Sequence, residues 1–351
     1  MDIEIRKSGN PFGTHRVIEP KDVLPQPALK IDNNMSYIWD NEILVDVKTL
    51  NIDSASFTQI KNKCLNDEEA IKEEILRIVN EKGKMQNPVT GSGGMFIGKV
   101  LKIGDKLRGK IDLKEGDKIA SLVSLSLTPL RIDKIIGIKK GTEQVNVSAK
   151  AILFESGIYA KLPKDIPEQL ALAVLDVAGA PAQTQRLVKP GDTVVIIGAG
   201  GKSGVLVSYA AKERAGVTGK VIGIEYSKAG VDKMKKMGFC DHSLMLDATD
   251  AVSCYETVRK VTDGRMADVV INCVNIPNTE MASILMTRER GIVYFFSMAT
   301  SFTKAALGAE GVGRDVDMVI GNGYMKGHAE IVIDILRKSK IIREDYEKHY
   351  V

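Results

Sequence analysis

The sequence has 351 residues, which at roughly 100–200 residues per domain predicts two domains. Hydrophobic residues make up 44% and charged residues 27%, as in an ordinary globular protein, and the net charge of +4 is too small to indicate nucleic-acid binding. The first residues do not read as a secretory signal, and no apolar run approaches the roughly 18 residues that a membrane span needs. Four cysteines without a Cys-x-x-Cys pair are typical of free thiols, so we expect a cytoplasmic protein.

Residues 1–165 have the pattern of a β-rich domain. The expected strands alternate with glycine turns and lie at 42–48, 96–100, 118–122 and 134–138. The clearest helical periodicity covers 67–82, where isoleucines recur on one face. Asn66 or Asp67 is its expected cap, and Gly83 is expected to end it.

After residue 165 the pattern changes to alternating strands and helices. A long helical stretch covers 167–188, with a possible interruption near 179–181. Strands are expected at 193–197, 221–224, 268–272, 291–296 and 317–320, and helices at 203–215, 228–237, 252–262, 278–287 and 328–338. Such alternation predicts βαβ units around a parallel sheet, and therefore an α/β fold of the doubly wound Rossmann class.

The first of these strands runs into a glycine-rich turn that predicts a dinucleotide site. Glycines permit the tight turn and let the backbone approach a pyrophosphate, which the start of the next helix attracts. The expected cofactor-binding residues are Gly198, Gly200, Gly201, Lys202, Ser203 and Gly204. A strict Gly-x-Gly-x-x-Gly motif would have glycine at 203, so the turn is a relaxed version, and an ordinary strand-to-helix turn is the alternative.

An acidic residue at the end of the next strand supports the dinucleotide interpretation. Glu225 follows the strand 221–224, where a carboxylate accepts hydrogen bonds from the ribose hydroxyls of NAD and repels the 2′-phosphate of NADP. We therefore expect NAD, with NADP the less favoured cofactor. Lys228 lies close by in the sequence and could weaken this discrimination.

No set of residues has the spacing of a zinc site. None of the four histidines pairs with a cysteine at ligand spacing. The stretch 91–95, where zinc-dependent dehydrogenases carry a Gly-His-Glu motif, contains only glycine, serine and methionine. We therefore predict neither catalytic nor structural zinc.

Without a metal, side chains must carry the proton chemistry. Asp53, Ser54 and Ser56 follow the first expected strand. Asp176 lies in an apolar helical stretch, where an unpartnered carboxylate is costly. His15 and Arg16 lie in a turn-rich N-terminal segment. The alternatives are a helix-surface acid at 176 and a structural, hydrogen-bonded histidine at 15.

The whole pattern resembles the medium-chain dehydrogenase/reductase superfamily, in its zinc-free branch. The matching segments are 41–47, 97–100, 113–119, 189–194, the glycine turn and 268–274. The resemblance implies a GroES-like substrate and catalytic domain at 1–165, with 323–351 packing back on it, and a Rossmann domain at 166–322. It also implies a homodimer or homotetramer.

Residues 10–20 and 23–28, together with 322–324 and 327–330, resemble the L-erythro-3,5-diaminohexanoate dehydrogenase family of anaerobic lysine fermentation. The resemblance implies NAD-dependent oxidative deamination of that diamino acid to 5-amino-3-oxohexanoate and ammonium, through an imine that water hydrolyses. We expect Asp53, Asp176 and His15 as catalytic groups, and Arg16 and Ser54 as substrate-binding groups. A zinc-free quinone or enoyl reductase and an inactive dinucleotide-binding protein are the alternatives.

Overall fold

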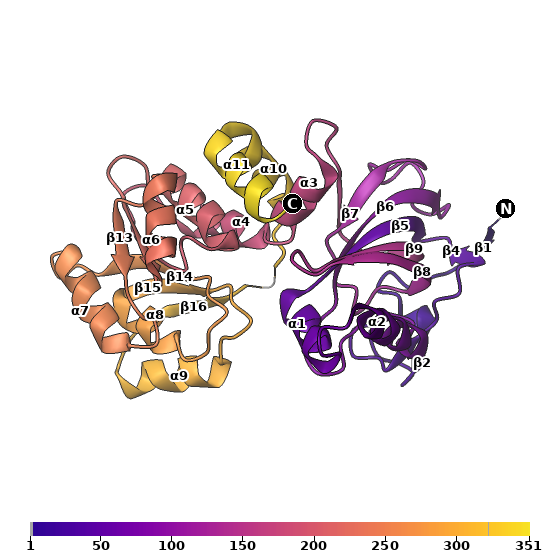
Figure 1. Ribbon diagram of the computed structural model, residues 1–351, viewed down its shortest axis with the longest axis horizontal. Helices are drawn as coiled ribbons and strands as arrows, with labels where there is room; N and C mark the ends of the chain where they lie inside the picture. Colours follow the sequence, from indigo (N-terminus) through magenta and orange to yellow (C-terminus); the bar gives the residue numbers. More distant parts are fainter. Residues whose placement is uncertain (1–2, 322) are drawn as a thin grey trace. The chain divides into compact units, whose positions relative to one another are not determined.

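The computed structural model describes residues 3–321 and 323–351, so Met1, Asp2 and Asn322 of the segments discussed above lie outside the described residues. The chain forms two compact units (Figure 1), Met1–Asp176 with Tyr350–Val351 and Val177–His349. The division falls after 176 and not after 165, because the helix α3 (Glu168–Leu175) belongs to the first unit. Residues 323–349 belong to the second unit and Tyr350–Val351 to the first.

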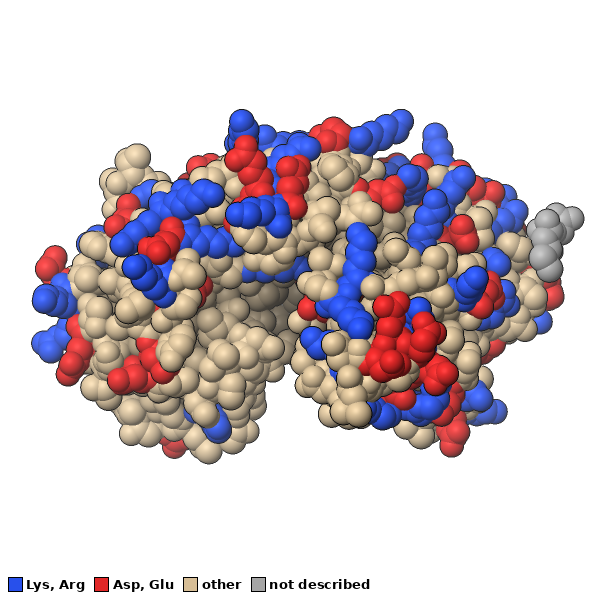
Figure 2. All heavy atoms as spheres, viewed as in Figure 1, with Lys and Arg blue, Asp and Glu red and all other residues tan. Residues whose placement is uncertain are grey.

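Charged side chains of both signs are interspersed on the face of each unit that Figure 2 shows. No block of lysine and arginine side chains stands out there, in agreement with the small net charge of +4. Within residues 3–321 and 323–351, the longest and most apolar helices still fall short of what a membrane crossing requires.

The first unit is built on a six-stranded sheet. Its strands are β5 (Glu42–Ile52), β6 (Gly94–Ile103), β7 (Lys118–Ser121), β8 (Leu130–Lys139), β9 (Gln144–Phe154) and β10 (Tyr159–Lys161). They lie in the order β10-β7-β6-β5-β9-β8, and every neighbouring pair is antiparallel. The expected β-rich domain is therefore present, and its first strand continues to Ile52, beyond the predicted end at 48.

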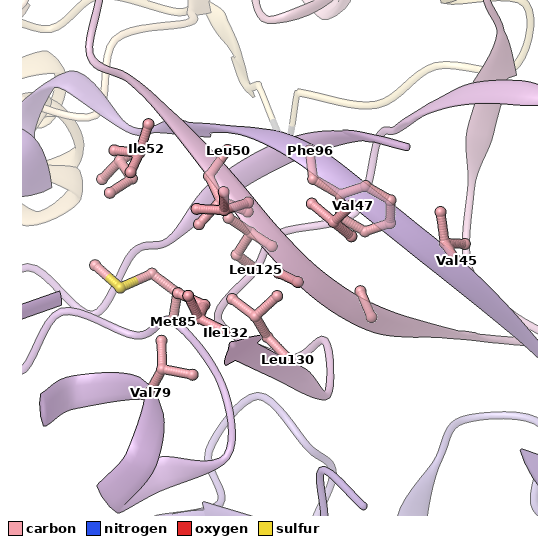
Figure 3. Close-up of a cluster of buried hydrophobic side chains, with 14 of the residues drawn as sticks. Val45, Val47, Leu50, Ile52, Val79, Met85, Phe96, Leu125, Leu130 and Ile132 are labelled. Atoms are coloured by element: carbon pink, nitrogen blue, oxygen red, sulfur yellow. The ribbon is translucent and has the colours of Figure 1, made fainter. Parts of the chain in front are cut away.

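Two helices follow β5 and close one side of its core, α1 (Ser54–Lys63) and α2 (Glu68–Lys82). The predicted helix at 67–82 is confirmed, since the Asp67 carboxylate accepts a hydrogen bond from the N–H of Ala70 and Gly83 ends the helix with a φ of 74°. Buried apolar side chains of β5, α2 and the neighbouring strands form the core in Figure 3, among them Val47, Leu50 and Val79. Each such side chain contributes roughly 1.5–3 kcal/mol by leaving water.

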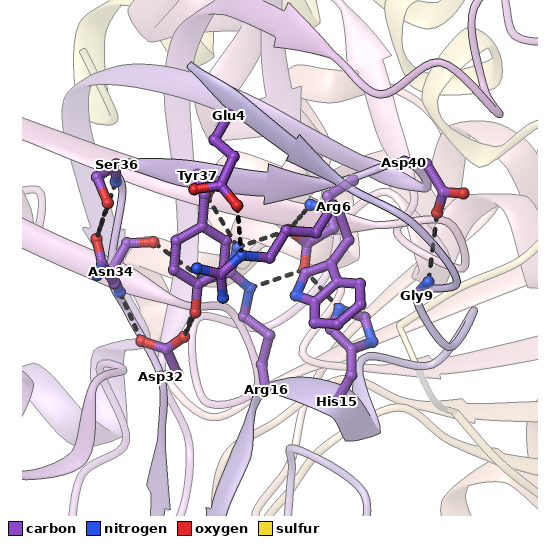
Figure 4. Close-up of polar contacts among 12 residues, drawn as sticks. Glu4, Arg6, Gly9, His15, Arg16, Asp32, Asn34, Ser36, Tyr37 and Asp40 are labelled. Carbon is purple, nitrogen blue, oxygen red and sulfur yellow. Dashed lines mark hydrogen bonds and ion pairs between the residues drawn. The ribbon is translucent and has the colours of Figure 1, made fainter.

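The N-terminal segment is attached to the start of β5 by a buried charge network (Figure 4). The segment contains β1 (Glu4–Arg6), a 3-10 turn (Thr14–Arg16), β2 (Val17–Glu19), β3 (Lys30–Ile31) and β4 (Tyr37–Trp39); β1 pairs with β4, and β2 with β3. The fully buried Glu42 carboxylate accepts hydrogen bonds from Nε and Nη2 of Arg16 at 2.8 and 2.7 Å, and from Nε2 of His15 at 2.8 Å. Burial alone would raise the pKa of Glu42, but these bonds outweigh it and hold the pKa below its usual range.

The second unit is a parallel sheet with helices on both faces. Its strands are β11 (Thr193–Ile197), β12 (Lys220–Glu225), β13 (His242–Met245), β14 (Ala267–Asn272), β15 (Thr287–Phe295) and β16 (Asp317–Ile320). Their order is β13-β12-β11-β14-β15-β16, so the direction of winding reverses between β11 and β14. This confirms the predicted Rossmann sheet, in which ligands bind at the carboxyl ends of the strands beside that reversal.

The helices of the second unit pack through apolar faces. They are α4 (Gly179–Leu187), α5 (Lys202–Ala215), α6 (Lys228–Met237), α7 (Ala251–Val261), α8 (Glu280–Met286), α9 (Phe302–Gly311), α10 (His328–Lys338) and α11 (Lys340–His349). Buried side chains of α4, α5 and α6 share one core with the sheet, and those of α7 and α8 share another. The helical stretch at 167–188 is divided into two helices close to the interruption expected near 179–181, because Pro181 lacks an N–H and suits the first turn of a new helix.

The network around Glu42 yields a stability prediction. Glu42→Gln removes the fully buried partner of Arg16 and leaves only the more distant, partly exposed Asp32 at 3.4 Å, so we expect the free energy of unfolding of the first unit to fall by roughly 3–5 kcal/mol. Trp39, the single tryptophan, packs on the His15 ring with centroids 4.8 Å apart and reports urea unfolding of this region by fluorescence. The control Glu4→Gln breaks an exposed ion pair with Arg6 and should cost no more than about 1 kcal/mol. Equal unfolding midpoints for the two variants would contradict the structural role of Glu42.

Candidate functional site

The turn between β11 and α5 has a backbone that only glycine accommodates. Gly198 has a φ of 80°. A Cβ on Gly204 would lie 1.9 Å from the carbonyl oxygen of Gly198, so the helix meets the end of the strand too closely for any side chain there. The N-cap of α5 is Gly201, which has no side chain to cap the helix. The positive end of the helix dipole at this point suits a phosphate group.

The remaining residues of the turn are held by their neighbours. The backbone N–H of Gly200 donates to Oε1 of Glu225 at 2.8 Å. The carbonyl of Lys202 accepts a hydrogen bond from the hydroxyl of Tyr346 on α11. Ser203 is buried and bonds the thiol of Cys273, whose pKa burial raises to about 12. The serine at 203, where a strict motif has glycine, is therefore accommodated by its hydrogen bond with Cys273.

A cavity of about 290 Å³ opens beside this turn at the carboxyl ends of the strands. Its lining is mostly apolar and comprises Ile197, Gly198, Ile224, Glu225, Tyr226, Leu246, Asp247, Ala248, Thr249, Val274, Ile276 and Thr279. A mostly apolar cavity whose acidic lining residues are Glu225 and Asp247 suits a flat heteroaromatic ring joined to a hydroxylated sugar. The turn, the helix start and Glu225 therefore fit a dinucleotide.

In the first unit, two of the predicted carboxylates come together where β5 ends. Asp53 lies between β5 and α1, and its Oδ2 accepts a hydrogen bond from the N–H of Gly93 at 3.0 Å. Asp176 lies at the end of α3, and its Oδ1 accepts one from the side-chain amide of Asn51 at 3.2 Å. The charge of Asp176 acts directly on Asp53.

The environment of Asp53 suits proton transfer. Burial raises the pKa of Asp53 and the negative charge of Asp176 raises it further, while hydrogen bonds from Ser92 and Gly93 offset part of the rise. A carboxylate with a raised pKa is a stronger proton acceptor near neutral pH. Two carboxylates side by side also attract a substrate ammonium group.

His15 and Arg16 lie far from this pair. Both contact Glu42 at the start of β5, whereas Asp53 follows the end of that strand. At about 3.3 Å per residue, the two ends of β5 lie roughly 30 Å apart. Nδ1 of His15 accepts from the N–H of Asn10 at 2.8 Å and Nε2 contacts Glu42. All five N–H groups of Arg16 are used within the fold. The geometry thus gives both residues a structural role, in place of the expected catalytic and substrate-binding ones.

Ser54, the other expected substrate contact, is exposed at the start of α1, directly after Asp53. Its hydroxyl donates to Oε1 of Glu143 at 3.1 Å. The structure adds to the site Asn51, Thr90 and Ser92, which the sequence did not indicate, beside Ser56, which the sequence places after the strand together with Asp53 and Ser54. Of the three added residues, only Asn51 had a signal, as a polar residue where a buried strand ends, and this one is 6% exposed.

Gly93 lies in the stretch 91–95, where zinc-dependent dehydrogenases carry a metal ligand, and neighbouring backbone leaves no room for a side chain there. A Cβ on Gly93 would lie 2.5 Å from the carbonyl oxygen of Met85 and 2.5 Å from the nitrogen of Ser126. Over the described ranges 3–321 and 323–351, no group of three or more histidine, cysteine, aspartate or glutamate side chains could hold a metal ion. The absence of zinc from the enzyme stays a prediction.

Two family matches divide the chain. Residues 15–163 match the family described as the L-erythro-3,5-diaminohexanoate dehydrogenase N-terminal domain, and residues 203–312 match the one described as zinc-binding dehydrogenase. The L-erythro-3,5-diaminohexanoate dehydrogenase of Acetoanaerobium sticklandii is 62% identical over 98% of this chain and 99% of its own length. That of Fusobacterium nucleatum is 58% identical over 98% and 100%.

Solved structures show the same fold at low identity. A mycobacterial quinone oxidoreductase aligns over 96% of this chain and 88% of its own with a TM-score of 0.55 and 18% identity. The CurK enoyl reductase aligns over 85% and 79% with a TM-score of 0.55 and 16% identity. These likenesses concern the fold alone.

Fold and relatives agree on the broad class of the protein. It is an enzyme, an oxidoreductase that uses a nicotinamide cofactor and a small-molecule substrate. The two curated relatives match it over nearly the full length of each chain. The chain therefore belongs to the L-erythro-3,5-diaminohexanoate dehydrogenase family.

Proposed function

We propose that the protein oxidises the 3-amino group of L-erythro-3,5-diaminohexanoate with NAD and releases 5-amino-3-oxohexanoate and ammonium, as in anaerobic lysine fermentation. The observation that carries the proposal is the 62% and 58% identity to two enzymes of that name over nearly their full length. The carboxylate pair in the first unit supports it, because an enzyme for a diamino acid must hold one ammonium group and deprotonate another.

The residues of the first unit divide this work. Asp53 takes a proton from the reacting ammonium group, which must be neutral before a hydride can leave its carbon. Asp176, held by the Asn51 amide at 3.2 Å, binds the positive charge of the substrate. Ser54 contributes a hydroxyl beside Asp53. When bound, NAD accepts the hydride, and water hydrolyses the resulting imine.

The residues proposed to hold the cofactor lie in the second unit. They are Gly198, Gly200, Gly201, Lys202, Ser203, Gly204 and Glu225. The turn receives the pyrophosphate at the start of α5, and the Glu225 carboxylate accepts from the ribose hydroxyls. Because a 2′-phosphate would place negative charge against Glu225, NAD is favoured over NADP.

We propose further that the enzyme assembles as a homodimer or homotetramer and works in the cytoplasm. The superfamily resemblance supports the first point. All four cysteines lie within the described residues and are free thiols, which supports a reducing compartment. Light scattering on the purified protein measures the assembly.

The substrate is tested by turnover. With NAD and L-erythro-3,5-diaminohexanoate, the purified enzyme should produce NADH, seen in its absorbance band, together with ammonium. Because side chains carry the proton chemistry, the activity should survive dialysis against a metal chelator. Reduction of a quinone or enone without turnover of the diamino acid would contradict the proposal, and so would cofactor binding without any turnover.

The cofactor preference is tested at Glu225. Glu225→Ser removes a charged hydrogen-bond acceptor and its repulsion of a 2′-phosphate, so the ratio of kcat/KM with NAD to that with NADP should fall about tenfold or more. Glu213→Gln removes a charge from an exposed position on α5 and serves as the control. An unchanged ratio in Glu225→Ser would rule out this role.

The carboxylate pair is tested by the pH dependence of kcat/KM. Asp53→Asn should lower kcat by roughly 10²–10⁴-fold, since it removes the proton acceptor. Asp176→Asn removes a negative charge that raises the pKa of Asp53, so the acidic limb of the profile should move to lower pH. Asp133→Asn, an exposed carboxylate on β8, is the control. A limb that stays in place in Asp176→Asn would show that Asp53 is not the titrating base.

A further inference from the structure

The proposed reaction requires an exit for a proton, and the following inference rests on that reaction. An ammonium substrate, NAD and water give a ketone, ammonium, NADH and one net proton. Asp53 is only partly exposed, and its carboxyl must lose the proton it has taken before the next turnover.

Three hydroxyl groups connect Asp53 to the surface. The Ser92 hydroxyl bonds the Asp53 carboxylate. Oγ of Ser92 lies 2.6 Å from Oγ of Ser56, which lies 2.6 Å from Oγ1 of Thr90. Ser92 and Thr90 are themselves 3.2 Å apart. Ser56 is fully buried, while Thr90 is exposed, so the chain begins at the carboxylate and ends at solvent.

The surrounding backbone fixes these groups in place. Ser56 lies in the first turn of α1, the helix that begins directly after Asp53. The side-chain oxygen of Asn87 accepts from the N–H groups of Val89 and Thr90, and its amide donates to the carbonyl of Ser56 at 3.3 Å. The loop that carries Thr90 and Ser92 is therefore folded onto the start of α1.

We propose that Ser92, Ser56 and Thr90 form a relay that carries the proton from Asp53 to water. Oγ of Ser92 accepts the proton from the Asp53 carboxyl as its own hydrogen passes to Oγ of Ser56. Ser56 passes its hydrogen to Oγ1 of Thr90, and Thr90 passes its own to water. Each hydroxyl ends with one hydrogen, Asp53 is again a carboxylate, and no oxidant or reductant takes part.

The test removes the outer two hydroxyls and leaves the Ser92 contact with Asp53 intact. In Ser56→Ala/Thr90→Ala, kcat for the diamino acid should fall about tenfold or more while KM is unchanged. Imidazole, a small proton acceptor, should restore kcat in proportion to its concentration, and it should not affect the wild-type enzyme. Thr90→Ser, which retains a hydroxyl, should keep wild-type kcat.

Thr58→Ala removes an exposed hydroxyl from the same helix and should leave kcat and its buffer dependence unchanged. Thermal unfolding of each variant separates loss of the relay from loss of the fold. A double variant that folds and turns over at the wild-type rate would overturn the relay, as would a loss of kcat that imidazole does not restore. Absence of turnover by the wild-type enzyme would instead overturn the proposed function.

Discussion

A carboxylate withdrawn from water must be compensated by hydrogen bonds and opposite charge, or its pKa rises. Strand β5 meets this constraint in opposite ways at its two ends. At its start, the bonds from Arg16 and His15 hold the pKa of Glu42 below its usual range. Just past its end, burial and, secondly, the negative charge of Asp176 raise the pKa of Asp53. One strand therefore anchors the N-terminal segment and presents a reactive acid to the substrate.

The second unit solves a different problem, the close approach of backbone to a phosphate. The contact between Gly204 and the carbonyl of Gly198 leaves no room for a side chain, so the start of α5 lies against the end of β11. Serine at 203 is tolerated because its hydroxyl faces the Cys273 thiol. Glycine is therefore required at 198 and 204, where the backbone leaves no room for a side chain. It is not required at 203, although the strict motif has glycine there.

Local signals in the sequence predicted much of the fold. The helix at 67–82 was recognisable from its periodicity and its end at Gly83, and β11 with its glycine turn from apolar residues followed by glycine. These features depend on contacts between neighbours in the chain. The sequence did not show helices α1, α9 and α11, whose apolar faces are weak or short.

The catalytic candidates show where such reasoning fails. Asp53 and Asp176 are brought together by the contact of Asn51 on β5 with Asp176 at the end of α3. These elements are more than a hundred residues apart, and no local sequence pattern predicts that they meet. His15 and Arg16 appeared equally suitable by residue type, but their long-range partner is Glu42. The hydroxyls of Thr90 and Ser92 meet that of Ser56 through a loop folded onto a helix. Serine and threonine are too common in turns for Thr90 and Ser92 to be selected from the sequence.

A carboxyl titration tests this account most directly. With ¹³C-labelled aspartate and glutamate side chains, NMR follows each carboxyl with pH, and the spectra of Asp53→Asn and Glu42→Gln assign the two signals. The account predicts that Asp53 titrates above the value of about 3.9 for an ordinary aspartate, and that Glu42 titrates below the value of about 4.3 for an ordinary glutamate. An Asp53 carboxyl that titrates at or below the ordinary value would contradict the central claim that this residue is the poised proton acceptor.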